Sequence, residues 1–123
     1  MAANKSFRDL VVWQKAIDLV DEIYLLTGTF PTEENFGLKS QIRRSAVSVP
    51  SNIAEGQGRG TPKEFLRFLN IVLGSLAELD TQIEIALRQK MIGMEEGKLV
   101  IEQIIEIRKM TYGLISNLKK RID

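Results

Sequence analysis

Apolar residues recur at alternating intervals of three and four along almost the whole chain, in four blocks separated by glycine or proline. This spacing places side chains on one face of an α-helix. The blocks span about residues 10–30, 34–57, 61–86 and 95–121. Four helices of this length, joined by short turns, predict an all-α, up-down-up-down four-helix bundle that forms one domain over residues 1–123.

The first block carries more apolar surface than one packed face of a helix requires. Its two adjacent seams cover an arc of about 200° on a helical wheel. One explanation is a central helix covered on most sides, and the other is a second buried face at a subunit interface; we favour the interface. The first seam comprises Leu10, Trp13, Ile17, Val20, Tyr24 and Thr27, and the second comprises Val12, Ala16, Leu19, Ile23, Leu26 and Phe30.

The second block contains a proline in its middle. The alternation in SAVSVPS resembles a strand, but Pro50 has no N–H for a sheet ladder, and the three-four spacing continues through it. We therefore expect a helix that bends at Pro50, where the ring displaces the carbonyl group of Ala46. Small side chains beside the seam should let another helix approach closely. The expected core positions are Leu38, Ile42, Ala46, Val49 and Ile53.

The stretch SVPSNIAEGQGRGTPKEF joins the second block to the third. Three alternating glycines and Arg59 before a helix could cradle a phosphate, but no strand precedes them and no Gly-Lys-Ser/Thr follows. We favour a hinge in which Gly56 or Gly58 ends one helix in the left-handed conformation. Thr61 and Glu64 then form a capping box for the next helix.

The third and fourth blocks complete the expected core. The turn between them is predicted at residues 92–94, and the cations at residues 119–121 suit the C-terminal end of the last helix. The third seam is Phe65, Phe68, Leu69, Val72, Leu76, Leu79, Ile83 and Ala86. The fourth is Val100, Ile104, Ile107, Thr111, Leu114 and Leu118, broadened by Ile101, Ile105, Tyr112 and Ile115.

Composition narrows the possible functions. The chain has no cysteine and no histidine, so it lacks thiolate chemistry, the usual neutral-pH base and the commonest transition-metal ligand. Ser48 and Ser51 have no lysine base closer than Lys39, and the paired acids at helix starts complement helix dipoles. We expect no enzyme activity, cofactor or metal. Without a signal peptide or membrane-spanning run, we expect a cytoplasmic protein with no membrane contact.

A polar stripe on the second block is the strongest candidate for a binding surface. The net charge of the whole chain is only +1, but residues 39–59 carry four cations against Glu55, which is +3 locally. Arginine forks suit phosphate oxygens, although no aromatic residue interleaves the stripe. The alternative is internal ion pairing with Glu55, Glu64 or Glu78. The stripe is Gln41, Arg44, Ser48, Ser51, Glu55 and Arg59, and the candidate nucleic-acid-binding residues are Lys39, Arg43, Arg44, Arg59, Lys63 and Arg67.

The segments FRDLVVWQKAIDLV, QIRRSAVSVPSNIAEGQGRGTPKEFLRFL and GSLAELDTQI resemble the 23S rRNA intervening-sequence proteins, from Phe7 to about Leu118. The resemblance implies a small four-helix bundle that assembles as a ring, a cyclic pentamer. The family is named for reading frames within inserts of large-subunit rRNA genes. It is similar to accessory proteins of diversity-generating retroelements, which bind nucleic acid and a reverse transcriptase but are markedly more basic than this chain.

Two functions follow from these observations. The first is an oligomer that binds structured nucleic acid through arginines repeated around the ring; we expect RNA, with ribosomal RNA as one candidate. The alternative is an oligomeric scaffold for a protein partner, whose arginines form structural ion pairs. In the second case alanine at Arg44 should destabilise the fold or the ring rather than weaken RNA binding alone.

Overall fold

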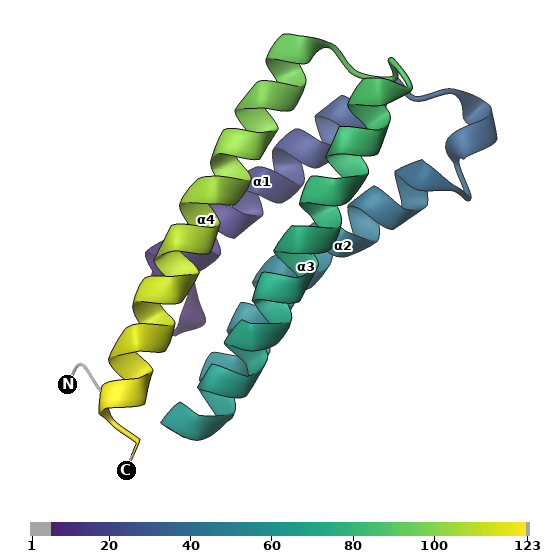
Figure 1. The fold of residues 1–123 in the computed structure, drawn as a ribbon. Coiled ribbons are helices and arrows are strands. Elements are labelled where there is room, and N and C mark those ends of the chain that lie inside the picture. The colour runs from purple at the N-terminus through teal and green to yellow at the C-terminus, as the bar shows by residue number, and fades with distance from the viewer. Residues whose placement is uncertain (1–5, 123) are drawn as a thin grey trace.

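A computed structural model describes residues 6–122. Within that part of the chain every regular element is a helix, which confirms the all-α, four-helix prediction (Figure 1). The ends of the predicted domain, residues 1–5 and Asp123, lie outside the described residues. In chain order the elements are the 3₁₀ helix η2 (Phe7–Asp9), α1 (Val11–Thr27), the 3₁₀ helix η3 (Thr32–Glu34), α2 (Leu38–Gly58), α3 (Pro62–Arg88) and α4 (Met94–Lys120).

The four long helices pack side by side with alternating direction. Each of the pairs α1–α2, α2–α3, α3–α4 and α1–α4 is in contact, so every helix has two neighbours. Figure 1 shows the α1–α2 and α3–α4 connections at one end of the bundle, and the N-terminal end of α1 and the C-terminal end of α4 at the other. The C-terminal end of α1 and the N-terminal ends of α2 and α4 therefore share one end of the molecule.

The core is formed by the predicted seams. All five positions expected on α2 except half-buried Leu38 are fully enclosed, and the seams of α3 and α4 are also buried apart from half-buried Phe65 and Leu114. The residues that are completely enclosed include Leu19, Ile23, Ile42, Ile53, Leu69, Leu76, Leu79, Ile83 and Ile104. The three-four spacing thus identified the packed faces correctly.

The two seams on α1 have different environments. Val12, Ala16, Leu19 and Ile23 of the second seam are buried in the core, whereas the first seam from Leu10 to Val20 is only half-buried. Tyr24 of the first seam keeps 44% of its surface exposed. One subunit therefore encloses the second seam apart from half-buried Leu26, and leaves the first seam partly accessible apart from buried Thr27. Burial of the accessible seam by another subunit stays a prediction.

The start of α2 differs from the prediction. We expected the helix to begin near Glu34, but η3 ends there and α2 begins at Leu38. The Glu34 carboxylate accepts a hydrogen bond from the Leu38 backbone N–H (3.0 Å), while Gly37 takes a non-helical conformation. Glu34 thus satisfies a free N–H at the helix start from outside the helix.

The helix continues through buried Pro50, and its predicted bend stays a prediction. The expected left-handed C-cap at Gly56 or Gly58 is wrong, because both glycines belong to α2 and Arg59 ends the helix in a right-handed conformation. The left-handed residue is Gly60, with φ of +86°. The turn thus reverses the chain two to four residues later than expected.

Gly56 has a packing role instead. A Cβ atom at this position would lie 2.6 Å from the Phe68 Cβ, so glycine lets α2 and α3 meet closely. Nearer the middle of the same contact, Ser48 Oγ donates to Ser75 Oγ at 2.6 Å, and both side chains are largely enclosed. The predicted close approach along the small residues of α2 is confirmed.

The predicted capping box at the start of α3 is half present. Thr61 Oγ1 accepts a hydrogen bond from the Glu64 backbone N–H at 3.2 Å, and Pro62 is the first helical residue. The Glu64 carboxylate bonds to Arg67 rather than back to Thr61. An arginine one turn ahead competes successfully for the carboxylate because it offers two charged donors.

Candidate nucleic-acid interface

The six predicted phosphate-binding residues fall into two groups. Lys39, Arg43 and Arg44 lie on the first two turns of α2 and form the α2-start cluster. The other three, Arg59, Lys63 and Arg67, form the turn cluster between α2 and α3. Arg44 and Arg59 are fifteen residues apart along α2 and its C-terminal cap, which corresponds to about 22 Å along the helix axis. This exceeds the Debye length of about 8 Å at physiological salt, so the groups act separately.

The α2-start cluster lines a shallow hollow of about 350 Å³. The hollow contains three cationic side chains and no carboxylate. It lies at the N-terminal end of α2, where the helix dipole also favours an anion. Its lining residues are Tyr24, Asn35, Lys39, Ser40, Arg43, Arg44 and Val47.

Arg43 is held in place by α1. Its Nε donates to Thr27 Oγ1 at 2.8 Å, its Nη2 donates to the Tyr24 carbonyl oxygen at 3.3 Å, and its guanidinium lies 4.2 Å from the centre of the Tyr24 ring. The Thr27 hydroxyl donates in turn to the Ile23 carbonyl oxygen at 2.7 Å. Arg43 thus bridges two helices with its charge unneutralised, since none of these partners is acidic.

The other two cations of the α2-start cluster are freer. The Lys39 ammonium lies 3.4 Å from Asn35 Oδ1, and Arg44 is exposed. Among residues 6–122, neither side chain has a carboxylate within ion-pairing distance. The predicted ion pairs of Arg43 and Arg44 are therefore not formed in this range, and Glu78 is exposed without such a pair there. This cluster keeps its full charge of three for a ligand.

The turn cluster is largely neutralised. Arg59 pairs with Glu55 at 2.8 Å, and Arg67 pairs with Glu64 at 3.3 Å. Three cations against two carboxylates leave a charge of +1. Both guanidinium groups lie over the Phe68 ring. The distance from the guanidinium carbon to the ring centre is 5.1 Å for Arg59 and 4.7 Å for Arg67. The ion-pair alternative is thus confirmed for Arg59 with Glu55, and these arginines serve the α2–α3 turn.

The Arg67–Glu64 contact can be tested by titration. The hydrogen bonds from Arg67 hold the pKa of Glu64 below its ordinary value. Folding lowers the pKa of Glu64, so the pair stabilises the fold at pH values above the pKa of Glu64 in the unfolded chain. That contribution is lost as the pH falls through the pKa of Glu64 in the folded protein. We expect Arg67→Ala to raise the pKa of Glu64 in an NMR titration of its carboxyl carbon, and Lys63→Ala to raise it less. An unchanged pKa in Arg67→Ala would contradict the contact.

Aromatic residues accompany both clusters, although the sequence of α2 showed none among its cations. Tyr24 comes from α1 and Phe68 from α3, and both stack against arginines of the candidate set. Thr27, placed by its spacing in an apolar seam, is instead the buried acceptor for Arg43. The spacing showed that Tyr24 and Thr27 lie one turn apart, but only the packing of α1 on α2 reveals that they position Arg43.

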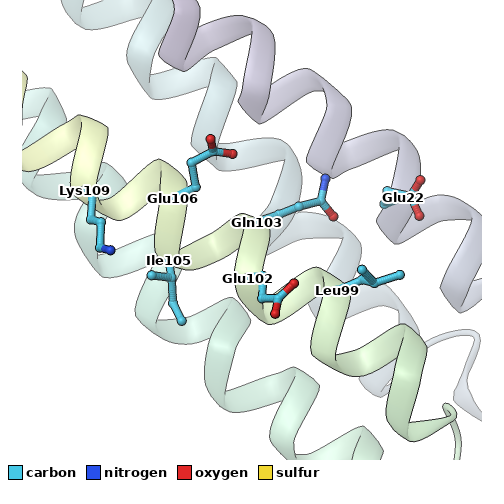
Figure 2. Close-up of a pocket in the computed structure, with 7 residues that line it drawn as sticks. All are labelled: Glu22, Leu99, Glu102, Gln103, Ile105, Glu106 and Lys109. Carbon is cyan, nitrogen blue, oxygen red and sulfur yellow. The ribbon is translucent and has the colours of Figure 1, made fainter.

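A different groove runs between α1 and α4. Figure 2 shows Glu22 of α1 opposite Leu99 and Gln103 of α4, with Glu102 and Glu106 further along. The groove measures about 550 Å³ and has three carboxylates against Lys109, so its charge repels phosphate. Lys15 of α1 pairs with Glu106 across it at 3.6 Å. This groove is unsuited to nucleic acid.

Metal-binding and membrane-spanning features are absent from residues 6–122. No cluster of three or more acidic groups in that range is arranged to hold a metal ion. None of the helices there combines the length and the apolar character needed to cross a membrane.

Comparisons with known proteins agree with the sequence resemblance. The sequence profile of the 23S rRNA-intervening sequence protein family matches residues 8–113. A crystal structure from Bacteroides thetaiotaomicron, described as a protein of unknown function from the S23 ribosomal protein family, superposes with a TM-score of 0.79. It is 26% identical, and the match covers 85% of this chain and 98% of the other. No curated protein matches the sequence.

Proposed function

This chain belongs to the 23S rRNA-intervening sequence protein family, and we propose that it is a non-enzymatic, self-assembling bundle that binds structured RNA. The observation that carries the proposal is the α2-start cluster, where Lys39, Arg43 and Arg44 line one hollow without a carboxylate. Uncompensated cations in a concave site attract phosphate more strongly than the paired arginines of the turn cluster.

The cluster has the composition of a backbone-binding site. Arg43 is pre-positioned by Thr27 and Tyr24, so it loses little side-chain entropy when it meets a phosphate. Arg44 and Lys39 supply further charges beside it, and the Ser40 hydroxyl and Asn35 amide in the same hollow can bond to phosphate or ribose oxygens. This set positions a backbone and does not read a sequence of bases.

Assembly would strengthen a contact that is weak in one copy. A single cluster offers only about three phosphate contacts, whereas copies joined in one oligomer hold several clusters at high effective concentration. The half-buried first seam of α1 and the exposed apolar residues at one end of the bundle support such an assembly. A ring of copies, which the family resemblance suggested, would present the clusters at regular intervals.

RNA binding is tested by titrating a fluorescent RNA hairpin at two salt concentrations. We expect affinity to fall with salt. Arg44→Ala should weaken binding several-fold and reduce the log–log salt slope by about 0.7 to 1, the value for one phosphate that is no longer neutralised. Arg88→Ala is the matched control, because Arg88 is an exposed arginine of α3 that pairs with Glu84. It should bind RNA like the wild type.

The outcome separates RNA binding from the scaffold alternative. Because Arg44 is exposed and unpaired among the described residues, Arg44→Ala should leave the melting temperature nearly unchanged. Binding that ignores salt, or equal affinity of the two alanine variants, would refute the RNA site. A large loss of thermal stability in Arg44→Ala would instead support a structural role in a protein scaffold.

A further inference from the structure

Phe36 is the most exposed large apolar side chain in the described chain, with 99% of its surface accessible. It lies in the segment between η3 and α2, immediately before Gly37. A phenylalanine commonly buries about 150 Å² or more in a folded protein or an interface. Its own subunit covers almost none of Phe36, so this apolar surface is available to another molecule.

An apolar hollow of about 230 Å³ lies at the same end of the bundle, between the last turns of α1 and the first turns of α4. Its floor and walls include Leu25 and Leu99, which are 72% and 61% exposed, together with Leu26 and Val100. It shares Glu22 and Leu99 with the groove in Figure 2, so the two form one trough along α1 and α4.

The charges around Phe36 and around the hollow are opposite. Phe36 is followed by the α2-start cluster, which carries three cations. The hollow is bordered by Glu22 and Glu96, and neither has an ion pair within residues 6–122. Opposite charge beside complementary apolar shapes both steers an encounter and fixes its register.

We propose that Phe36 of one copy inserts into the Leu25–Leu99 hollow of a second copy, with Lys39 close to Glu22 or Glu96 of that copy. This inference rests on the self-assembly half of the proposed function and names its contact surfaces. Arg43 and Arg44 lie one turn or more beyond Lys39 along α2 and are not required for the contact, which leaves them for phosphate.

The contact joins two different surfaces, so each copy can place its Phe36 on one neighbour and offer its hollow to another, which makes the contact head-to-tail. Such a contact leaves one free Phe36 and one free hollow after each copy is added. Assembly therefore continues until a ring closes or a filament grows. The segment that holds Phe36 precedes α2, and the hollow lies between the end of α1 and the start of α4. These helix ends share one end of the bundle (Figure 1). Copies consequently add around the bundle axis rather than along it, which favours a closed ring.

The first test is the mass of the purified chain by light scattering. We expect the wild type to give a multiple of 13.9 kDa at micromolar concentration, and Phe36→Ser to give a monomer with unchanged helical circular dichroism. Tyr112→Ser is the control, since Tyr112 is an exposed aromatic residue of α4 that does not line the hollow. It should assemble like the wild type.

The second test uses the absence of cysteine from the chain. Asn35 precedes Phe36 and Thr29 lines the hollow, so cysteines at these two positions leave Phe36 and the leucines in place. Mixing Asn35→Cys with Thr29→Cys under mild oxidation should produce a disulfide-linked pair containing one copy of each variant. Asn35→Cys mixed with Tyr112→Cys should not form such a pair. A pair that forms only between the first two variants shows that the segment around Phe36 of one copy lies against the hollow of another. A two-fold dimer with reciprocal insertion would give the same pair, so a mass of more than two copies by light scattering identifies head-to-tail docking.

These results also distinguish failure of the contact from failure of the proposed function. An assembled Phe36→Ser variant, or an oligomer without the Asn35–Thr29 crosslink, overturns the contact and leaves self-assembly standing. A monomeric wild type overturns both. RNA binding is decided independently by Arg44→Ala, which should still assemble, and monomeric Phe36→Ser should bind RNA several-fold more weakly while retaining the salt dependence of one cluster.

Discussion

Leu76→Ala is expected to destabilise the protein by about 2 to 5 kcal/mol, the largest loss anticipated for a single truncation. Leu76 lies midway along α3, has no exposed surface and belongs to the core cluster that all four helices share. Truncating its side chain to a methyl group forfeits the transfer free energy of the missing carbons. It also leaves a cavity, because the four packed helices of the bundle cannot all move inward.

Urea unfolding followed by circular dichroism, at one fixed protein concentration, measures this loss. Met94→Ala is the control: its side chain is exposed at the start of α4, and the free energy of unfolding should change by no more than about 0.5 kcal/mol. If Leu76→Ala and Met94→Ala unfold at the same urea concentration, the packing of α3 in this structure is wrong.

Gly56→Ala is expected to destabilise the protein by about 1 to 3 kcal/mol, although the same change usually stabilises a helix. The new Cβ would lie 2.6 Å from the Phe68 Cβ and 3.1 Å from a ring carbon of Phe65. A Cβ cannot move by changing rotamer, so α2 and α3 must separate to relieve the overlap. Their separation would also stretch the 2.6 Å Ser48–Ser75 hydrogen bond.

Gly74→Ala, on the neighbouring helix α3, is expected to have the opposite effect on the stability of the fold. Gly74 lies inside α3 and an added Cβ would meet nothing within 4 Å, so alanine should stabilise the fold by about 0.5 to 1 kcal/mol. Thermal or urea unfolding of both variants gives the comparison. Stabilisation by Gly56→Ala would show that α2 and α3 are farther apart at Gly56 than in this structure.

The helices themselves were predictable because their apolar positions repeat with the helical period. Ile42, Val49 and Ile53 lie inward on α2, as their spacing indicates, and α4 begins within one residue of its predicted start. The start of α2 was not predictable, because it depends on the Glu34 side chain bonding to Leu38. Boundaries set by one side-chain contact leave no periodic signal.

The cations of the candidate site could be predicted from the sequence, but their arrangement in space could not. A helical wheel places Arg44 and Arg59 on one face of α2, but it omits the rise along the axis that separates them by about 22 Å. Which arginines are neutralised also depends on neighbours. Arg59 pairs within its own helix, at a spacing visible in the sequence, whereas Arg43 bonds to Thr27 and Tyr24 from another helix.

The sequence by itself determined the helical class, the four packed faces and the family, because each depends on residue type and spacing along one segment. Only the tertiary structure decided which glycine allows close packing, which seam of α1 stays accessible and which cations remain unpaired among the described residues. Those properties depend on distances between segments that are remote in the chain. They arise when α1 packs on α2 and α2 on α3, so no pattern within a single helix encodes them.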